Sequence, residues 1–306
     1  MGPGLLSARA PFFSFRRREL PLLASELLGF PADARVLIVN CDDFGMRRGV
    51  NAAVVEAIEG GIAGSCSLMV PCGGTEEAMG LLRERPEVSF GVHLSLVCEA
   101  GARSGRGPVA PRADVASLVD EDGELHTPER RAELMARARI EDVEVEFRAQ
   151  VETVVAAGLE PTHLDWHCLL DGGRGDVFEL TVALAGEYGL AVRVWGEAGR
   201  QRVRGLPVVD HDFLDSFSLP LDGKAERYAR LLRELPAGLS EWAVHPGLRD
   251  AQSRAVDPDG WRVRQSDHEF LVSAEARELL REEGIFVVDY RGVRERWHPE
   301  AGGGPG

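Results

Sequence analysis

Seven polar residues near the ends of four apolar segments are the main candidates for catalysis or metal binding in this sequence. They are Asp42, Asp43, His93, His163, Asp165, His167 and His245. Carboxylates and imidazoles bind divalent metal ions, and both also act as general acids and bases. Because they follow separate segments, they can form one site only in a fold that brings the segment ends together. The pattern therefore predicts a metal site with acid–base groups beside it, an arrangement that suits hydrolysis, provided that the fold brings these residues together.

Two aspartates stand side by side after the apolar run VLIVN at 36–40. In a regular strand, Asp42 and Asp43 would point to opposite faces, and adjacent carboxylates repel each other. An ordinary structural explanation is that one of them caps the following turn. The functional explanation divides their work, since one carboxylate would bind a metal while its neighbour stays free as a general base.

The segment THLDWH at 162–167 gives the strongest local signal. In a strand, His163, Asp165 and His167 share one face. Burying each of them unpaired would cost about 2–7 kcal/mol, so shared partners are expected. His167, nearest the strand end, is the better metal ligand, and Asp165 is placed to orient an imidazole from behind.

A further imidazole, His93, lies in the otherwise apolar segment GVHLSL at 91–96. Alone, it would be a buried, hydrogen-bonded histidine. Together with one aspartate and a second imidazole it completes a three-ligand set, which leaves positions open for water and substrate. The facial triad of non-haem iron oxygenases uses the same ligand types, so ligand type alone does not decide the chemistry.

The remaining histidines are expected to be ordinary surface residues. They are His126, His211, His268 and His298. Arg264 and Asp267 are expected to form either a surface ion pair or substrate contacts in the loop that follows the His245 strand.

Strands and helices are expected to alternate from Ala34 onward. The expected strands are 36–40, 65–71, 88–96, 162–167, 191–195, 241–247 and 285–290, and the expected helices are 49–61, 75–84, 140–157, 176–188, 222–235 and 272–283. Such alternation is typical of parallel βαβ units and predicts an α/β fold, a (β/α) barrel of about seven parallel strands, complete or incomplete. The rim at the carboxyl ends of the strands would then collect the polar residues.

The chain is expected to form one domain. Residues 1–33 are predicted as an N-terminal arm, 34–293 as the barrel domain, and 294–306 as a flexible tail. A long irregular insertion at about 97–138 is expected to cover the site, because insertions of this length are usually functional.

Composition excludes several classes of partner. A net charge of −15 argues against nucleic acid and anionic membrane surfaces. No apolar run reaches the ~18 residues of a membrane span, and the first twenty residues lack the apolar core of a secretory signal. Five scattered cysteines without a CxxC pair predict buried thiols in a reducing cytosol. We therefore expect a cytoplasmic protein that acts on a small molecule.

The motifs VNCDDFGM, FGVHLSL, PTHLDWH, AVHPG and RQSDHEFL…LREEGIFVVDYR resemble, in this order, the YdjC/ChbG-like carbohydrate deacetylase family over about residues 35–292. The resemblance implies a distorted (β/α) barrel related to the polysaccharide deacetylases and one divalent ion, with magnesium or zinc favoured. It also implies removal of an acetyl group from an N-acetylated amino sugar such as a small chito-oligosaccharide. The resemblance assigns the metal ligands as Asp43, His93 and His167, the base as Asp42, and the acid as His245. Substrate-binding or supporting positions are expected at His163, Asp165 and Arg264.

The sequence departs from the family pattern directly after the expected metal ligand His167. Many relatives continue THLDSH with further histidines, whereas Cys168, Leu169 and Leu170 follow His167 here. The contacts to substrate next to the metal are therefore expected to differ. Two rival functions stay open: a metal-dependent amide or ester hydrolase with a non-carbohydrate substrate, and a catalytically degenerate sugar-binding protein. The oligomeric state is also open, a homodimer included.

Overall fold

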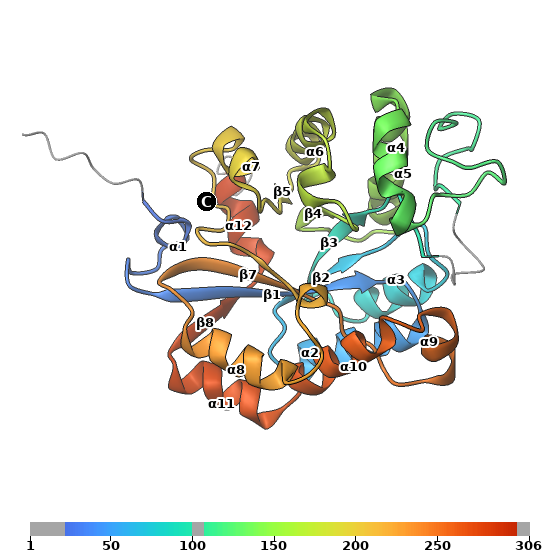
Figure 1. Cartoon of the computed structure of the whole chain (residues 1–306). Helices are drawn as coiled ribbons and strands as arrows, with labels where there is room; N and C mark the ends of the chain where they lie inside the picture. Colours follow the sequence, from blue (N-terminus) through green and yellow to red (C-terminus); the bar gives the residue numbers. More distant parts are fainter. Residues whose placement is uncertain (1–21, 100–106, 299–306) are drawn as a thin grey trace, which may run out of the picture.

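A curled parallel sheet organises the residues that the computed structural model describes, 22–99 and 107–298 (Figure 1). Its strand order is β5-β4-β3-β2-β1-β7-β6, and β8 also pairs with β1. In chain order the strands are β1 (Arg35–Phe44), β2 (Ser65–Leu68), β3 (Ser89–Leu94), β4 (His163–Trp166), β5 (Ala191–Val192), β6 (Leu214–Asp215), β7 (Gly238–Val244) and β8 (Ile285–Val288). Because β5 and β6 are the unjoined ends of the path within the described residues, the barrel is open. This confirms the predicted distorted barrel of about seven parallel strands.

Strand β1 lies at the centre because its residues suit burial on both faces. Val36, Leu37, Ile38 and Val39 are each at most 1% exposed, and a continuous apolar run is typical of a parallel strand covered on both sides. One edge of β1 pairs with β7. The other edge pairs first with β8 and then, nearer the carboxyl end, with β2.

Helices connect the strands and cover the sheet (Figure 1). In chain order they are α1 (Ala24–Leu27), α2 (Arg48–Glu59), α3 (Thr75–Arg83), α4 (Arg131–Arg137), α5 (Ile140–Ala156), α6 (Gly175–Tyr188), α7 (Glu197–Arg202), α8 (Lys224–Arg233), α9 (Ala251–Val256), α10 (Trp261–Leu271), α11 (Ala274–Glu282) and α12 (Tyr290–Trp297). In α2, which packs on β1, Val50, Val54 and Ala57 recur at helical spacing and are fully buried. Within the described residues, none of the helices combines the length and apolar character needed to span a membrane.

The packed domain extends into both segments that we predicted as an arm and a tail. Helix α1 belongs to the predicted arm, yet the Ala24 N–H donates to Asp210 Oδ1 at 2.8 Å. Helix α12 continues to Trp297, whose buried indole N–H donates to the Pro207 carbonyl at 2.9 Å. Residues 24–27 of the predicted arm and 294–297 of the predicted tail are therefore helical and packed on the domain, and residues 1–21 and 299–306 lie outside the described residues.

The described part of the predicted insertion is packed against the domain. Glu146 of α5 accepts the backbone N–H groups of Val109 and Ala110, each at 3.0 Å. The Cys98 N–H donates to the His126 carbonyl at 2.9 Å. This fold-back leaves His126 only 3% exposed, so its prediction as a surface residue was wrong.

Candidate active site

The irregular end of β1 turns both of its aspartates into one cavity. Asp43 has a φ of +67°, and the pairing of β1 with β2 shifts between Cys41 and Phe44. Our prediction that Asp42 and Asp43 face opposite sides was wrong, because this backbone breaks the alternation of the strand. Both carboxylates line a cavity of about 570 Å³ at the carboxyl ends of the strands. A positive φ in a non-glycine residue is strained and is often found at functional sites.

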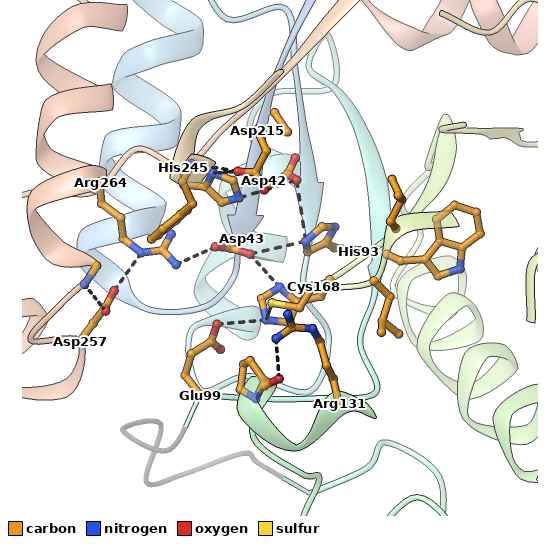
Figure 2. Close-up of a pocket in the computed structure, with 18 of the residues that line it drawn as sticks. Asp42, Asp43, His93, Glu99, Arg131, Cys168, Asp215, His245, Asp257 and Arg264 are labelled. Carbon is orange, nitrogen blue, oxygen red and sulfur yellow. Dashed lines mark hydrogen bonds and ion pairs between the residues drawn. The ribbon is translucent and has the colours of Figure 1, made fainter. Parts of the chain in front are cut away.

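Asp43 faces two imidazoles, one from β3 and one from the residue directly after β4 (Figure 2). Its Oδ1 lies 3.5 Å from His93 Nε2 and 3.1 Å from His167 Nδ1. This oxygen is buried and makes no hydrogen bond, and the three residues offer ligand atoms within 4.8 Å of one another. A buried, unpaired carboxylate oxygen is costly unless a cation or donor satisfies it. The donor set therefore fits a divalent metal ion.

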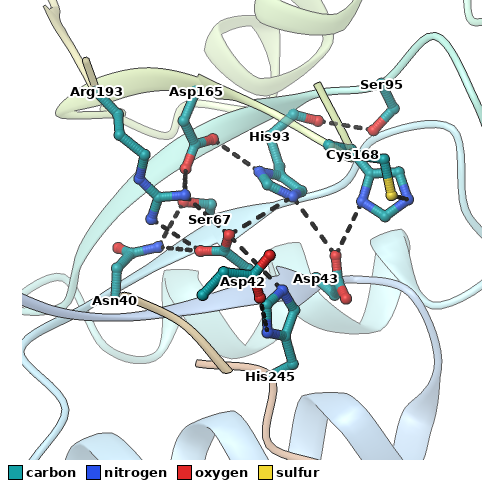
Figure 3. Close-up of polar contacts among 12 residues, drawn as sticks. Asn40, Asp42, Asp43, Ser67, His93, Ser95, Asp165, Cys168, Arg193 and His245 are labelled. Atoms are coloured by element: carbon teal, nitrogen blue, oxygen red, sulfur yellow. Dashed lines mark hydrogen bonds and ion pairs between the residues drawn. The ribbon is translucent and has the colours of Figure 1, made fainter. Parts of the chain in front are cut away.

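Each of these imidazoles is backed by a second carboxylate on its other nitrogen. Asp165 Oδ1 lies 2.8 Å from His93 Nδ1 (Figure 3), and Glu99 Oε1 lies 3.0 Å from His167 Nε2. Burial by itself would lower the pKa of His93, but Asp165 outweighs it and raises that pKa to about 10. Carboxylates in this position orient histidine ligands. The sequence placed Asp165 correctly but gave no signal for Glu99.

His163, the first residue of β4, lies behind the cavity wall. Its Nε2 is 3.8 Å from Asp165 Oδ2, and its ring stacks on Tyr290 with centroids 3.6 Å apart. Burial lowers the pKa of His163 to about 3. A neutral, stacked imidazole in this position supports the site and does not reach the cavity.

A buried arginine, which the sequence analysis missed, holds Asp42 (Figure 3). Arg193 Nη1 and Nη2 each donate to one oxygen of Asp42 at 2.8 Å, and the Asn40 amide adds a bond of 2.7 Å. Burial opposes ionisation of Asp42, but Arg193 lowers its pKa. Arg193 follows the two-residue strand β5, where we predicted a longer strand at 191–195. A charged residue inside the apolar run AVRVW was the available signal.

His245 closes the cavity on the side of β7. Its Nδ1 lies 2.8 Å from the Ser216 hydroxyl, and its Nε2 lies 4.0 Å from Asp42 Oδ2. The His245 N–H donates to Asp267 Oδ2 at 2.9 Å, which fixes the backbone at this point. The structure thus brings His245 to the same cavity as the two aspartates, as the sequence predicted.

Arg264 lies on α10, and its buried guanidinium group binds a carboxylate of the site. Its Nη2 is 2.7 Å from Asp43 Oδ2, and its Nε is 3.1 Å from Asp257 Oδ2. The surface ion pair proposed for Arg264 and Asp267 was wrong, since both are buried and Asp267 pairs with Lys224 at 2.7 Å. The placement in a loop was also wrong, because residues 261–271 form a helix whose inner face carries these charges.

The cavity wall combines aromatic, apolar and acidic side chains. Trp195 stacks on Phe213 with centroids 3.5 Å apart and planes 6° apart. The three residues after His167 (Cys168, Leu169 and Leu170) also line the cavity. Cys168 is exposed, unlike the other four cysteines, so the prediction of buried thiols fails there. His211, His268 and His298 lie outside the cavity lining at partly exposed positions.

The buried charges around the site leave an excess of two negative charges. The carboxylates belong to Asp42, Asp43, Asp165 and Glu241, and the guanidinium groups to Arg193 and Arg264; all are under 5% exposed. Despite burial, the neighbouring carboxylates raise the pKa values of His93 and His167, so two protonated imidazoles balance this excess when no cation is bound. A divalent cation held there would take the place of those two protons.

Comparisons with known proteins cover most of the described fold. The model of a family described as YdjC-like protein matches residues 36–282. A carbohydrate deacetylase from Geobacillus stearothermophilus is 37% identical over 259 residues, which span 84% of this chain and 97% of that protein. A chitooligosaccharide deacetylase from Serratia marcescens is 28% identical, over 84% and 98% of the two chains. A solved structure from Enterococcus faecalis, named for cellobiose-phosphate cleavage, is 25% identical with a TM-score of 0.71, over 85% and 99%.

Proposed function

This chain belongs to the YdjC-like family, and from that premise we propose that it is a metal-dependent hydrolase that removes the acetyl group from an N-acetylated amino sugar or small oligosaccharide. The observation that carries the proposal is the buried Oδ1 of Asp43, which makes no hydrogen bond and faces the imidazoles of His93 and His167. The names of two relatives, a carbohydrate deacetylase and a chitooligosaccharide deacetylase, support the substrate class.

Asp43, His93 and His167 would hold the cation, for which magnesium and zinc are the favoured identities. A metal ion bound there would polarise the acetyl carbonyl and lower the pKa of a bound water. Asp165 and Glu99 would keep the two imidazoles oriented, since each faces the nitrogen directed away from Asp43.

Asp42 would act as the general base. Arg193 and Asn40 fix the direction of its carboxylate. The lowered pKa keeps Asp42 ionised, and an ionised carboxylate can accept the proton of the attacking water. Because the fixed carboxylate does not have to reorient during the reaction, part of the barrier is removed in advance.

His245 would act as the general acid. An amine leaves poorly as an anion, so the departing sugar nitrogen needs a proton as the C–N bond breaks. The Ser216 hydroxyl holds Nδ1 of His245, and Nε2 remains on the side of Asp42. A protonated Nε2 is therefore placed to donate within the cavity.

The cavity wall suits a sugar. The stacked pair Trp195 and Phe213 gives an aromatic surface against which a pyranose ring can pack. Acidic residues at the cavity, Glu99 and Asp257 among them, favour a neutral substrate and a cationic amine product over a polyanion.

Acetate release tests the proposal. The metal-loaded protein is incubated with N-acetylglucosamine and its short β-linked oligomers, and acetate is measured with Asp42→Asn as the inactive control. We expect acetate from at least one of these sugars. Hydrolysis of unrelated amides or esters without acetate from any sugar would favour the non-carbohydrate hydrolase, and tight sugar binding without turnover would favour a degenerate binding protein.

A further inference from the structure

Glu241, in the middle of β7, is a buried carboxylate that accepts from three side chains. Arg193 Nε donates to Oε1 at 2.8 Å. The Tyr290 hydroxyl and the Trp195 indole N–H both donate to Oε2, at 2.8 Å and 3.3 Å. Glu241 is 1% exposed and does not line the cavity, so it has no direct contact with a substrate there.

Two of these donors, Arg193 and Trp195, also contact different parts of the proposed active site. The two remaining nitrogens of Arg193 hold Asp42 (Figure 3). The ring of Trp195 forms the cavity wall and stacks on Phe213. The Arg193 guanidinium also lies over the Trp195 ring, 5.0 Å from its centroid. One carboxylate therefore fixes both the group that orients Asp42 and the aromatic wall.

We propose that Glu241 is a positioning residue that couples the aromatic wall to the catalytic carboxylate, through Trp195 on one oxygen and through Arg193 on the other. This inference rests on the proposed function, which gives Asp42 the role of base and the cavity the role of sugar site. Trp195 is then a residue that determines specificity, and its orientation depends on a contact behind the wall.

The chemistry of the two oxygens explains why a carboxylate is needed. A carboxylate accepts on both oxygens, whereas an amide accepts on one and donates from the other end. In Glu241→Gln the amide NH₂ must face either Arg193 Nε–H or the donors of Trp195 and Tyr290. Glu241 has two arms, the hydrogen bond from Arg193 to one oxygen and the hydrogen bond from Trp195 to the other. One of these arms therefore loses its acceptor in the variant, while the size of the side chain is unchanged.

The test compares Glu241→Gln with two other variants. Tyr290→Phe is the matched control, because it removes a donor to Glu241 and leaves both arms in place. Trp195→Phe keeps an aromatic ring but removes the indole N–H and part of the ring surface that lines the cavity. We expect kcat of Glu241→Gln to fall about tenfold to hundredfold, as for a displaced catalytic group, with unchanged metal content. We expect Tyr290→Phe to stay within about threefold of wild type, and Trp195→Phe to raise KM for oligosaccharides with a smaller effect on kcat.

A second readout does not depend on turnover. The indole N–H proton resonance of Trp195, assigned by its loss in Trp195→Phe, should move upfield in Glu241→Gln whichever way the amide faces. Its acceptor is either lost or changes from a carboxylate to a neutral carbonyl, which is a weaker acceptor. An unmoved resonance, or a Glu241→Gln enzyme no slower than Tyr290→Phe, overturns the inference. Absence of acetate release by the wild type would instead contradict the proposed function, and the resonance would still decide whether Glu241 holds Trp195.

If Glu241→Gln does not fold, the arms are tested separately. Arg193→Lys should then lower kcat, and Trp195→Phe should raise KM. Wild-type values of kcat in the first variant or of KM in the second would overturn the coupling.

Discussion

Asp42 and Asp43 are adjacent in the sequence, yet each carboxylate is bound by a different buried arginine. Arg193 covers both oxygens of Asp42, at 2.8 Å each. Arg264 binds one oxygen of Asp43, at 2.7 Å, and leaves Oδ1 to face His93 and His167. The two neighbours thus have different surroundings, which supports different roles for them in the proposed reaction.

Arg193→Lys should lower the rate of acetate release about tenfold to hundredfold without loss of metal. A lysine ammonium is a point charge and cannot bind both oxygens of Asp42 in the parallel geometry of a guanidinium. Arg193→Met should in addition lower the free energy of unfolding by about 3–5 kcal/mol, because buried carboxylates lose their partner. Steady-state kinetics and denaturant unfolding measure the two effects, and wild-type turnover in Arg193→Lys would contradict the positioning of Asp42.

His163→Gln should make the protein less sensitive to acid. Burial is the main cause that lowers the pKa of His163 to about 3; Asp165 opposes the shift and Arg193 adds to it. The unfolded chain binds a proton at this histidine below about pH 6.5, whereas the folded chain does not. The free energy of unfolding therefore falls as pH drops from about 6.5 toward 3, and the variant lacks this contribution.

Urea unfolding of both proteins between about pH 4 and pH 7 measures this difference. The variant should lose less stability on acidification than the wild type, whatever its stability at neutral pH. Equal or steeper loss in the variant would show that His163 does not remain neutral in the folded protein.

Thiol reagents should react first at Cys168. This thiol is exposed and lines the cavity, 3.4 Å from His167 Nε2, whereas the other four cysteines are buried. Iodoacetamide should therefore block turnover, and Cys168→Ser should be resistant. Peptide mass spectrometry identifies the modified residue. Full activity after complete modification of Cys168 would show that the adduct leaves the substrate path open.

The meeting of the strand-end residues could be predicted from the sequence. Parallel strands bring their carboxyl ends to one edge, so polar residues that close apolar runs converge there. Asp42, Asp43, His93, His167 and His245 share one cavity for this reason. The cytoplasmic location remains a prediction, and the oligomeric state stays open.

The side chains that hold these residues could not be predicted in the same way. Arg193 follows β5 and Glu241 lies in β7, 48 residues further along the chain, so the two meet only when the sheet curls. Arg264 was assigned to a loop because its segment is rich in charged residues, and the helix that buries it shows no clear apolar run. The positive φ of Asp43 also leaves no mark in the sequence, since the position is not a glycine.

The most direct test compares the metal content and acetate release of Asp42→Asn and Asp43→Asn. These variants change the same atom in adjacent residues, so each controls for the other. We expect Asp42→Asn to keep one divalent ion per chain while turnover falls at least about 100-fold, and Asp43→Asn to lose both the ion and the activity. Wild-type turnover in Asp42→Asn, or full metal content in Asp43→Asn, would contradict the division of roles between the two aspartates.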